Sequence, residues 1–368
     1  MKYFIIAGER SGDLHASNLI KELRKKDSSA EIVCWGGDYM ESAGARLLRH
    51  YKEYSIMGFI EVAFSLRKIS QLFKACHQDI LDFNPDVLIL VDFSGFNLRV
   101  AKFAKEHDFK VFYYISPKIW AWNQSRANKV KKLVDRMFVI MPFEEEFYQR
   151  YDYKVDYVGN PLKDAISAFK ADPEFRIKNK IGAEPIIAIL PGSRKQEVEV
   201  MLEEMVRIVP FFPGYRFVIA GVSNLPSAFY ERFRRQDVID VVYDQTYDLL
   251  SNASAALVTS GTATLETALF SVPQVVVYRA SPITYLIVKA LIKVKYISLV
   301  NLIAGKEVVK ELIQSELNQG NLKTELKHIL EGVKRSKQLS DYQELQTILG
   351  EKGASEKTAS LMWKYLQA

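Results

Sequence analysis

The chain has 368 residues, of which 48% are hydrophobic and 26% are charged, so about two domains with full hydrophobic cores are expected. Its 50 basic residues are offset by 44 acidic ones, and the net charge of +6 permits an anionic ligand or membrane surface without requiring nucleic acid. We therefore expect no nucleic-acid partner. No run of about 18 uninterrupted apolar residues occurs, so no membrane-spanning helix is expected either.

Two features indicate a cytoplasmic protein. The first residues form an apolar run that is too short for a signal peptide and leads directly into a glycine-containing loop. Cys34 and Cys76 lie in apolar segments without the spacing of metal ligands, which is typical of buried thiols in a reducing compartment.

Short apolar runs alternate with helix-length amphipathic segments along the whole chain. This alternation is typical of parallel β-sheets that carry helices on both faces. The runs fall into two clusters, and each cluster predicts one doubly wound, Rossmann-like parallel sheet of the α/β class. The first cluster comprises 3–7, 31–35, 87–91, 110–115, 137–141 and 155–158, and the second comprises 186–190, 217–220, 238–243, 256–259 and 274–278.

A polar segment with Pro161, Pro173 and Gly182 separates the two clusters and predicts a domain boundary. We place the N-terminal domain at 1–168 and the C-terminal domain at 169–345. The remaining 346–368 has a helical pattern, and its apolar residues must pack on the N-terminal domain or on a partner chain, which leaves a homodimer open. Ligands of such sheets bind beyond the carboxyl ends of the strands, so two facing domains predict a cleft.

The loop after the first predicted strand contains Gly8, Ser11, Gly12 and Asp13. The glycines permit close approach of a ligand to the backbone, and the helix that follows offers free N–H groups to an anion. The spacing is not that of a Gly-x-Gly-x-x-Gly fingerprint, which disfavours NAD. Helix capping by Ser11 or Asp13 is the simpler alternative, but three polar residues between two glycines favour a ligand site.

Asp92 follows the apolar run 87–91, at the carboxyl tip of a predicted strand. A carboxylate in this place is well positioned as a general base. An Asx turn or a helix N-cap explains the residue equally well. The later loop 116–123 contains Trp120 and Trp122, which either line a sugar or acyl pocket or pack on the core.

The second cluster contains two loops of the same kind, 192–194 and 260–262, each between a predicted strand and a predicted helix. The unpaired N–H groups at a helix start suit a phosphate, and an arginine adds a planar donor fork. Each loop alone would be an ordinary turn, but the pair predicts a site for a nucleotide diphosphate, with an acidic residue one turn into the second helix on the ribose. The predicted ligand residues are Gly192, Ser193, Arg194, Ser260, Gly261, Thr262 and Glu266.

The five histidines are scattered, and no carboxylate cluster accompanies them. We therefore expect no metal site and no cofactor.

Together, nine segments in this order and spacing resemble the bacterial lipid-A-disaccharide synthase family along nearly the whole chain. The segments are 8–13, 57–62, 91–93, 116–122, 157–161, 190–194, 260–266, 301–305 and 311–314. The resemblance implies a GT-B glycosyltransferase fold, with acceptor binding in 1–168 and UDP-sugar binding in 169–345. It further implies inverting transfer of 2,3-diacylglucosamine from its UDP derivative to 2,3-diacylglucosamine 1-phosphate, in lipid A (lipopolysaccharide) biosynthesis, with UDP as the second product.

The resemblance also implies roles for particular residues. The family commonly has a second aspartate three residues after the first, where this chain has Gly95, so the expectation of a general base concentrates on Asp92. Glu9 is the next candidate base, and Arg194 would stabilise the departing UDP. The remaining implied substrate-binding residues are Asn301 and Glu311.

Acylated, lipid-linked sugar substrates require an apolar entry surface. The stretch 57–73 mixes apolar residues with Arg67 and Lys68 and predicts an amphipathic helix on a membrane, although a helix buried under loops has the same pattern. We expect peripheral association with the cytoplasmic face of the inner membrane. The predicted acyl or membrane contacts are Met57, Ile60, Phe64, Ile69, Leu72 and Phe73.

Two other functions stay open at this point. One is a different GT-B enzyme that uses a UDP-sugar, either another transferase or an epimerase. The other is a non-catalytic, two-lobed nucleotide-sugar-binding protein, which would have no need for a base at Asp92.

Overall fold

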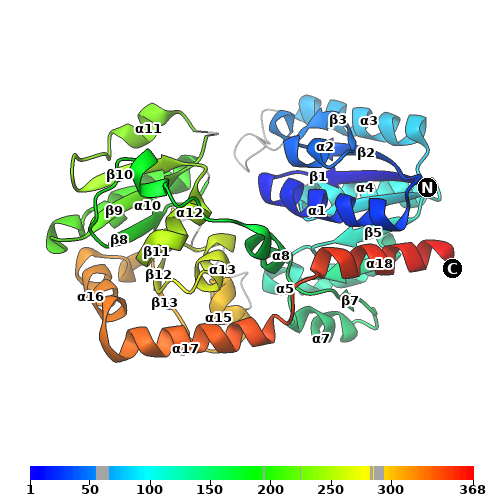
Figure 1. Cartoon of the computed structure of the whole chain (residues 1–368). Helices are drawn as coiled ribbons and strands as arrows, with labels where there is room; N and C mark the ends of the chain where they lie inside the picture. Colours follow the sequence, from blue (N-terminus) through cyan, green and yellow to red (C-terminus); the bar gives the residue numbers. More distant parts are fainter. Residues whose placement is uncertain (55–65, 194, 224, 282–284, 286–293) are drawn as a thin grey trace. The chain divides into compact units, whose positions relative to one another are not determined.

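The structure is a computed structural model that describes residues 1–54, 66–193, 195–223, 225–281, 285 and 294–368. The chain divides into two compact units, each built around its own sheet (Figure 1). Unit 1 comprises Met1–Asp164 and Glu351–Ala368, and unit 2 comprises Ala165–Gly350. The chain therefore passes between the units at 164/165 and 350/351, where the sequence had suggested 168/169 and 345/346.

Within the described residues, unit 1 contains a seven-stranded parallel sheet in the order β3-β2-β1-β4-β5-β6-β7. The strands are β1 (Lys2–Ala7), β2 (Glu31–Gly36), β3 (Arg46–His50), β4 (Val87–Val91), β5 (Val111–Tyr114), β6 (Arg136–Val139) and β7 (Asp156–Tyr157). The helices of this unit are α1 (Arg10–Lys26), α2 (Asp38–Ser42), α3 (Leu66–Phe83), α4 (Ser94–Glu106), α5 (Ile119–Trp122), α6 (Ala127–Leu133), α7 (Phe143–Gln149), α8 (Pro161–Ala168), which begins here and ends in unit 2, and α18 (Ala354–Gln367). Short 3-10 helices are η1 (Tyr51–Glu53) and η3 (Gln124–Arg126).

In the described part of unit 2, a six-stranded parallel sheet has the order β10-β9-β8-β11-β12-β13. The strands are β8 (Ile186–Leu190), β9 (Arg216–Gly221), β10 (Ile239–Tyr243), β11 (Ala253–Thr259), β12 (Gln274–Tyr278) and β13 (Lys310–Ile313). The helices are α9 (Phe175–Lys178), α10 (Lys195–Val206), α11 (Ser227–Glu231), α12 (Thr246–Asn252), α13 (Thr262–Leu269), α15 (Leu299–Ala304), α16 (Gln319–Leu330) and α17 (Gly332–Ile348), with the 3-10 helices η4 (Val209–Phe211) and η5 (Gln314–Glu316).

The central strands are covered on both faces. Ile187 and Ile189 of β8 belong to one core cluster, with apolar residues of α10 and α16, whereas Ile186 and Ala188 belong to another, with α12. Successive side chains of a strand point to opposite faces, so two clusters on one strand require helices on each side of the sheet. The α/β class with two parallel, Rossmann-like sheets is thus confirmed.

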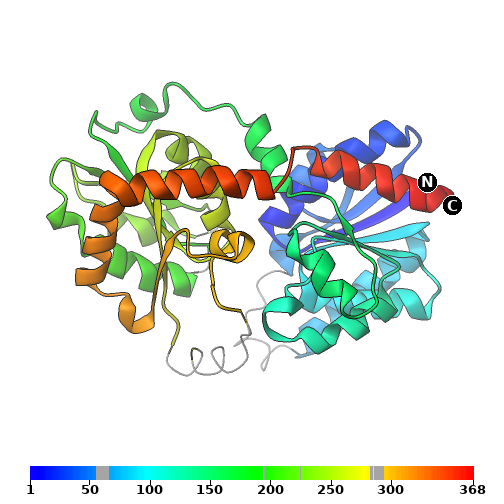
Figure 2. The same ribbon diagram turned by 90° about the horizontal axis from the view of Figure 1, so that it is seen from below.

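The C-terminal helix α18 packs against α1 of the same chain, and both views show the two helices side by side (Figures 1 and 2). Ala359 and Met362 are fully buried in the core cluster that contains β1. Asp164 accepts hydrogen bonds from the backbone N–H groups of Gly353 and Ser355 at 2.6 and 2.9 Å, and so caps the helix start. The apolar face of α18 is therefore covered within unit 1.

No helix among the described residues combines the length and the apolar character that a membrane crossing requires.

Candidate functional site

Each sheet has a point at which the strand order reverses. In unit 1, β1 pairs with β2 on one side and with β4 on the other, and in unit 2, β8 pairs with β9 and with β11. The connections from such a central strand lead in opposite directions, so the loops at the carboxyl ends diverge and leave room for a ligand. The four glycine- or aspartate-containing loops that the sequence singled out follow β1, β4, β8 and β11. They therefore meet in two pairs, one pair at each reversal point.

In unit 1, the two loops touch. A Cβ atom on Gly8 would lie 2.2 Å from the ring of Phe93, so only glycine lets the loop after β4 approach the loop after β1. Gly12 is buried in the first turn of α1, where its close approach brings this helix against β1. Glu9 is exposed and Ser11 is half-buried, which leaves both at the surface of this edge.

The side chain of Asp13 is engaged by the fold. Its Oδ1 accepts from the N–H groups of Gly37 and Met40 at 2.9 and 3.1 Å, and its Oδ2 accepts from the N–H of Tyr39 at 3.1 Å. The side chain is almost fully buried, and burial raises its pKa despite these bonds. Asp13 therefore holds the start of α2, and its role in substrate binding stays a prediction.

Asp92 lies directly after β4, and its N–H continues the sheet by donating to the carbonyl of Tyr114 at 3.1 Å. The residue is partly exposed, yet burial of the carboxyl group raises its pKa. The charge of Lys118, which follows the neighbouring strand β5, acts in the opposite direction. A carboxyl group with a raised pKa is a better proton acceptor once ionised, so the environment suits a general base.

Glu144 is a buried carboxylate that the sequence did not single out. Its Oε2 accepts from the N–H groups of Ile140 and Met141, and its Oε1 accepts from the hydroxyl of Ser116 and from Nε1 of Trp120. Burial raises its pKa to about 6. Glu144 thereby fixes the loop that contains Lys118 and the two tryptophans. Its sequence context, three consecutive glutamates, is typical of an exposed helix and gave no signal of this role.

In unit 2, the loops after β8 and β11 also adjoin. Gly192 has φ +101°, which favours glycine, and a Cβ atom there would contact Thr259 at 3.9 Å. Ser193 is exposed, whereas Arg194 lies outside the described residues. The hydroxyl of Thr259 is buried and has no hydrogen-bond partner among the described residues. An unsatisfied polar atom at this edge is consistent with a site that a ligand completes.

The loop after β11 leads into α13. Gly261 and Thr262 are exposed at the start of this helix, and the hydroxyl of Ser260 donates to the carbonyl of Ile297 at 2.9 Å. Glu266 is half-buried one turn into the helix and accepts from the hydroxyl of Tyr247 at 3.0 Å. Burial raises the pKa of Glu266. The hydrogen bond from Tyr247 engages Oε1, and a carboxylate has a second oxygen that can accept from a sugar hydroxyl.

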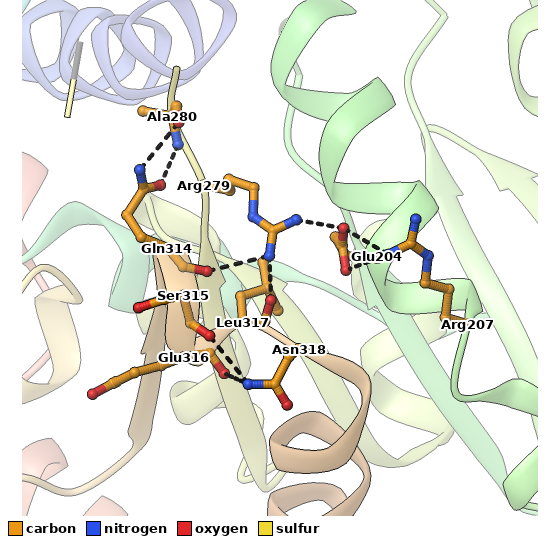
Figure 3. A network of polar contacts seen from close by, with 9 residues as sticks. All are labelled: Glu204, Arg207, Arg279, Ala280, Gln314, Ser315, Glu316, Leu317 and Asn318. Atoms are coloured by element: carbon orange, nitrogen blue, oxygen red, sulfur yellow. Dashed lines mark hydrogen bonds and ion pairs between the residues drawn. The ribbon is translucent and has the colours of Figure 1, made fainter. Parts of the chain in front are cut away.

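Arg279 follows β12 but is not available to an anion (Figure 3). Its guanidinium pairs with Glu204 of α10, whose side chain is 9% exposed, and donates to the carbonyls of Gln314 and Leu317. Gln314 in turn exchanges two hydrogen bonds with the backbone of Ala280. This network ties the chain after β12 to the chain after β13 and neutralises the cation.

Asn301 and Glu311 are joined to each other and to nearby backbone groups by hydrogen bonds. Asn301 is fully buried; its Oδ1 accepts from the N–H groups of Val308 and Val309, and its Nδ2 donates to the Val309 carbonyl and to Glu311. These four bonds use the hydrogen-bonding capacity of the amide. Glu311 accepts from the N–H groups of Ile297 and Ser298 at 3.0 and 2.9 Å. Both residues therefore hold this segment beside Ser260, whose hydroxyl binds Ile297, and their role in substrate binding stays a prediction.

The residues predicted to contact acyl chains divide into three groups. Ile69 and Leu72 lie half-buried on α3. Phe73 is also half-buried, and its ring stacks on Phe96 of α4 with ring centroids 4.6 Å apart. The others, Met57, Ile60 and Phe64, lie outside the described residues.

No three His, Cys, Asp or Glu side chains gather as metal ligands in the part of the chain that the structure describes. The expectation of chemistry without a metal stays a prediction.

Comparison with known proteins identifies the family. The family model described as lipid-A-disaccharide synthetase matches residues 3–364. Lipid-A-disaccharide synthase of Geobacter metallireducens is 36% identical over 382 residues, covering 99% of this chain and 97% of that protein. The Myxococcus xanthus enzyme is 35% identical over 373 residues, with 99% and 97% covered.

Solved structures with the same fold have little sequence in common with this chain. UDP-GlcNAc 2-epimerase from Neisseria meningitidis, bound to UDP-GlcNAc, has a TM-score of 0.72 at 13% identity, with 99% of this chain and 100% of that chain covered. The MnaA–UDP co-structure from S. aureus has a TM-score of 0.70 at 14% identity, with 100% and 97% covered. These likenesses establish the fold, while the family follows from the whole-chain sequence match. The chain belongs to the lipid-A-disaccharide synthetase family.

Proposed function

We propose that this chain joins UDP-2,3-diacylglucosamine to 2,3-diacylglucosamine 1-phosphate, giving the lipid A disaccharide 1-phosphate and UDP. The observation that carries the proposal is the family match over residues 3–364. The pairing of the predicted loops at the two reversal points of the sheets supports it. The test is to incubate the protein with both substrates and to detect UDP together with a disaccharide product.

The reaction converts an α-linked donor into a β-linked product, so it proceeds by a single displacement. The 6-hydroxyl oxygen of the acceptor attacks the anomeric carbon, Asp92 takes the hydroxyl proton, and the bond to UDP breaks. The leaving diphosphate carries the bonding electrons and requires positive charge nearby. The start of α13 and Arg194 supply it in this proposal, because Arg279 is already paired with Glu204.

The first prediction concerns Asp92. Asp92→Asn keeps the shape and removes the basicity, so turnover should fall roughly 100- to 10,000-fold while UDP-sugar binding stays intact. In the wild type, kcat should fall as the pH drops through the raised pKa of Asp92, because protonation removes the base. Steady-state kinetics over a pH series measures both effects.

Glu9→Gln is the comparison variant for this experiment. If Asp92→Asn keeps near-normal turnover, Asp92 is not the base. Glu9, on the adjoining loop after β1, would then be the next candidate.

The second prediction concerns the nucleotide. Arg194→Ala should weaken UDP binding by about 2 kcal/mol, roughly 30-fold, because a charge-assisted contact to the diphosphate is lost. Glu266→Gln should weaken UDP binding less, because it alters only the hydrogen bonds to the ribose hydroxyls. Calorimetric titration with UDP measures both, with Arg207→Ala as the control, since Arg207 is an exposed arginine of the same unit that pairs with Glu204. Equal affinities of Arg194→Ala and the control would remove Arg194 from the site.

The third prediction is that turnover requires no divalent metal. Activity should be the same after dialysis against EDTA as before, because the positive charge for the leaving group comes from the protein. A loss of activity that magnesium or manganese restores would contradict this.

We also propose peripheral association with the cytoplasmic face of the inner membrane through 57–73. The support is the lipid character of the substrates and the exposed Arg67 and Lys68 on α3. The wild type should float with anionic liposomes, and Phe64→Glu combined with Leu72→Glu should release it. Ile177→Glu is the matched control, because Ile177 is a 78% exposed apolar side chain of unit 2. If the wild-type protein does not bind the liposomes, the membrane proposal is wrong and 57–73 belongs to the hydrophobic core.

A further inference from the structure

The backbone at Asp92 and Phe93 is held in an unusual conformation. Both residues have φ +47°, in the left-handed region that favours glycine, and they occupy it consecutively. Such a conformation persists only where the surroundings hold it. The question is therefore which contacts prevent this pair from relaxing.

Two buried side chains hold the backbone at this point. Asn97, on α4, donates from its Nδ2 to the carbonyls of Val91 and Asp92 at 3.2 and 2.8 Å. Tyr113, on the adjacent strand β5, donates its hydroxyl to the same Asp92 carbonyl. Both side chains are fully buried. The Asp92 carbonyl thus receives two donors from two different elements, which defines the orientation of the peptide plane after Asp92.

Asn97 occupies this position at a cost to stability. With its Nδ2 on the two carbonyls, its Oδ1 is buried and has no hydrogen-bond partner among the described residues. An unsatisfied buried acceptor is destabilising, so the residue is explained by what its amide donor does.

The backbone conformation decides where the Asp92 side chain points. A change of this residue to an ordinary right-handed or extended conformation would redirect its Cα–Cβ bond and so move the carboxyl group from its present place at the carboxyl edge of the sheet. The aromatic ring of Phe93 is fixed at the same time, since it packs over Gly8 and against Tyr54 and Phe96.

We propose that Asn97 and Tyr113 are positioning residues that hold the left-handed Asp92–Phe93 backbone and so fix the Asp92 carboxylate at the carboxyl edge of the sheet. The effect of this positioning on turnover rests on the proposed function of Asp92 as the base. The positioning itself does not depend on that function and can be measured separately.

The sharpest variant is Tyr113→Phe, which removes one hydroxyl and leaves the ring. Its matched control is Tyr153→Phe, because Tyr153 is also buried in unit 1 and donates its hydroxyl to a backbone carbonyl, that of Val134, at 2.9 Å. Both variants should lose similar stability in a thermal melt. Only Tyr113→Phe should lower kcat, by about 10-fold with KM changed less than about twofold, because a misplaced base affects the transition state more than binding. Asn97→Ala should act in the same direction.

A readout without turnover separates this proposal from the function. Carbon-13 labelling of the aspartate carboxyl groups, with Asp92→Asn to assign the signal, gives the pKa of Asp92 directly. We expect this pKa to move toward that of an exposed aspartate in Tyr113→Phe and Asn97→Ala, because the freed carboxyl group gains water, and to stay unchanged in Tyr153→Phe.

An Asp92 titration identical in Tyr113→Phe, Asn97→Ala and the wild type would overturn the proposal, whatever the activity. If Asn97→Ala does not fold, Tyr113→Phe alone decides. A shifted titration together with normal turnover of Asp92→Asn would uphold the positioning role and refute the assignment of the base.

Discussion

The reversal of strand order at β1 and at β8 is the constraint on which the rest of the structure depends. Parallel strands require crossover connections, and a central strand with neighbours on both sides sends those connections in opposite directions. The backbone at its carboxyl end is then left without a covering helix. Polar groups gather there because the remainder of each central strand is buried on both faces and accepts only apolar side chains. Most of the residues predicted to bind or transform a substrate accordingly lie in the loops after β1, β4, β8 and β11.

Much of the fold could be predicted from the sequence, because the central strands are apolar throughout. The strands that were missed are β3 and β13, which lie at the edges of their sheets. Their sequences, Arg46–His50 and Lys310–Ile313, mix charged with apolar residues because an edge strand is partly exposed to water. A local apolar pattern cannot reveal a strand whose identity comes from its pairing with a neighbour. The position of α18 on α1 likewise depends on contacts that are distant in the sequence.

The candidate site could be predicted less completely. Glycines after apolar runs located the loops, and Gly8 and Gly192 have the close contact or the positive φ that explains them. The pattern could not distinguish polar residues that face a ligand from those that hold the backbone. Asp13 and Asn301 lie in the expected segments, yet their side-chain oxygens already accept hydrogen bonds from backbone N–H groups of other loops. Which polar side chain remains available is decided by long-range contacts, and these appear only once the chain has folded.

Two carboxyl groups of unit 1, Glu144 and Asp92, show how the surroundings of a side chain decide whether it serves the structure or the chemistry. Both have raised pKa values because burial disfavours the charged form. Glu144 accepts from four donors, so both of its oxygens are occupied and its charge is used to fix a loop. At Asp92, the donors from Asn97 and Tyr113 bind the backbone carbonyl and not the carboxylate. The fold thus immobilises the main chain of Asp92 while leaving its side chain able to accept a proton, which is the combination that a general base requires.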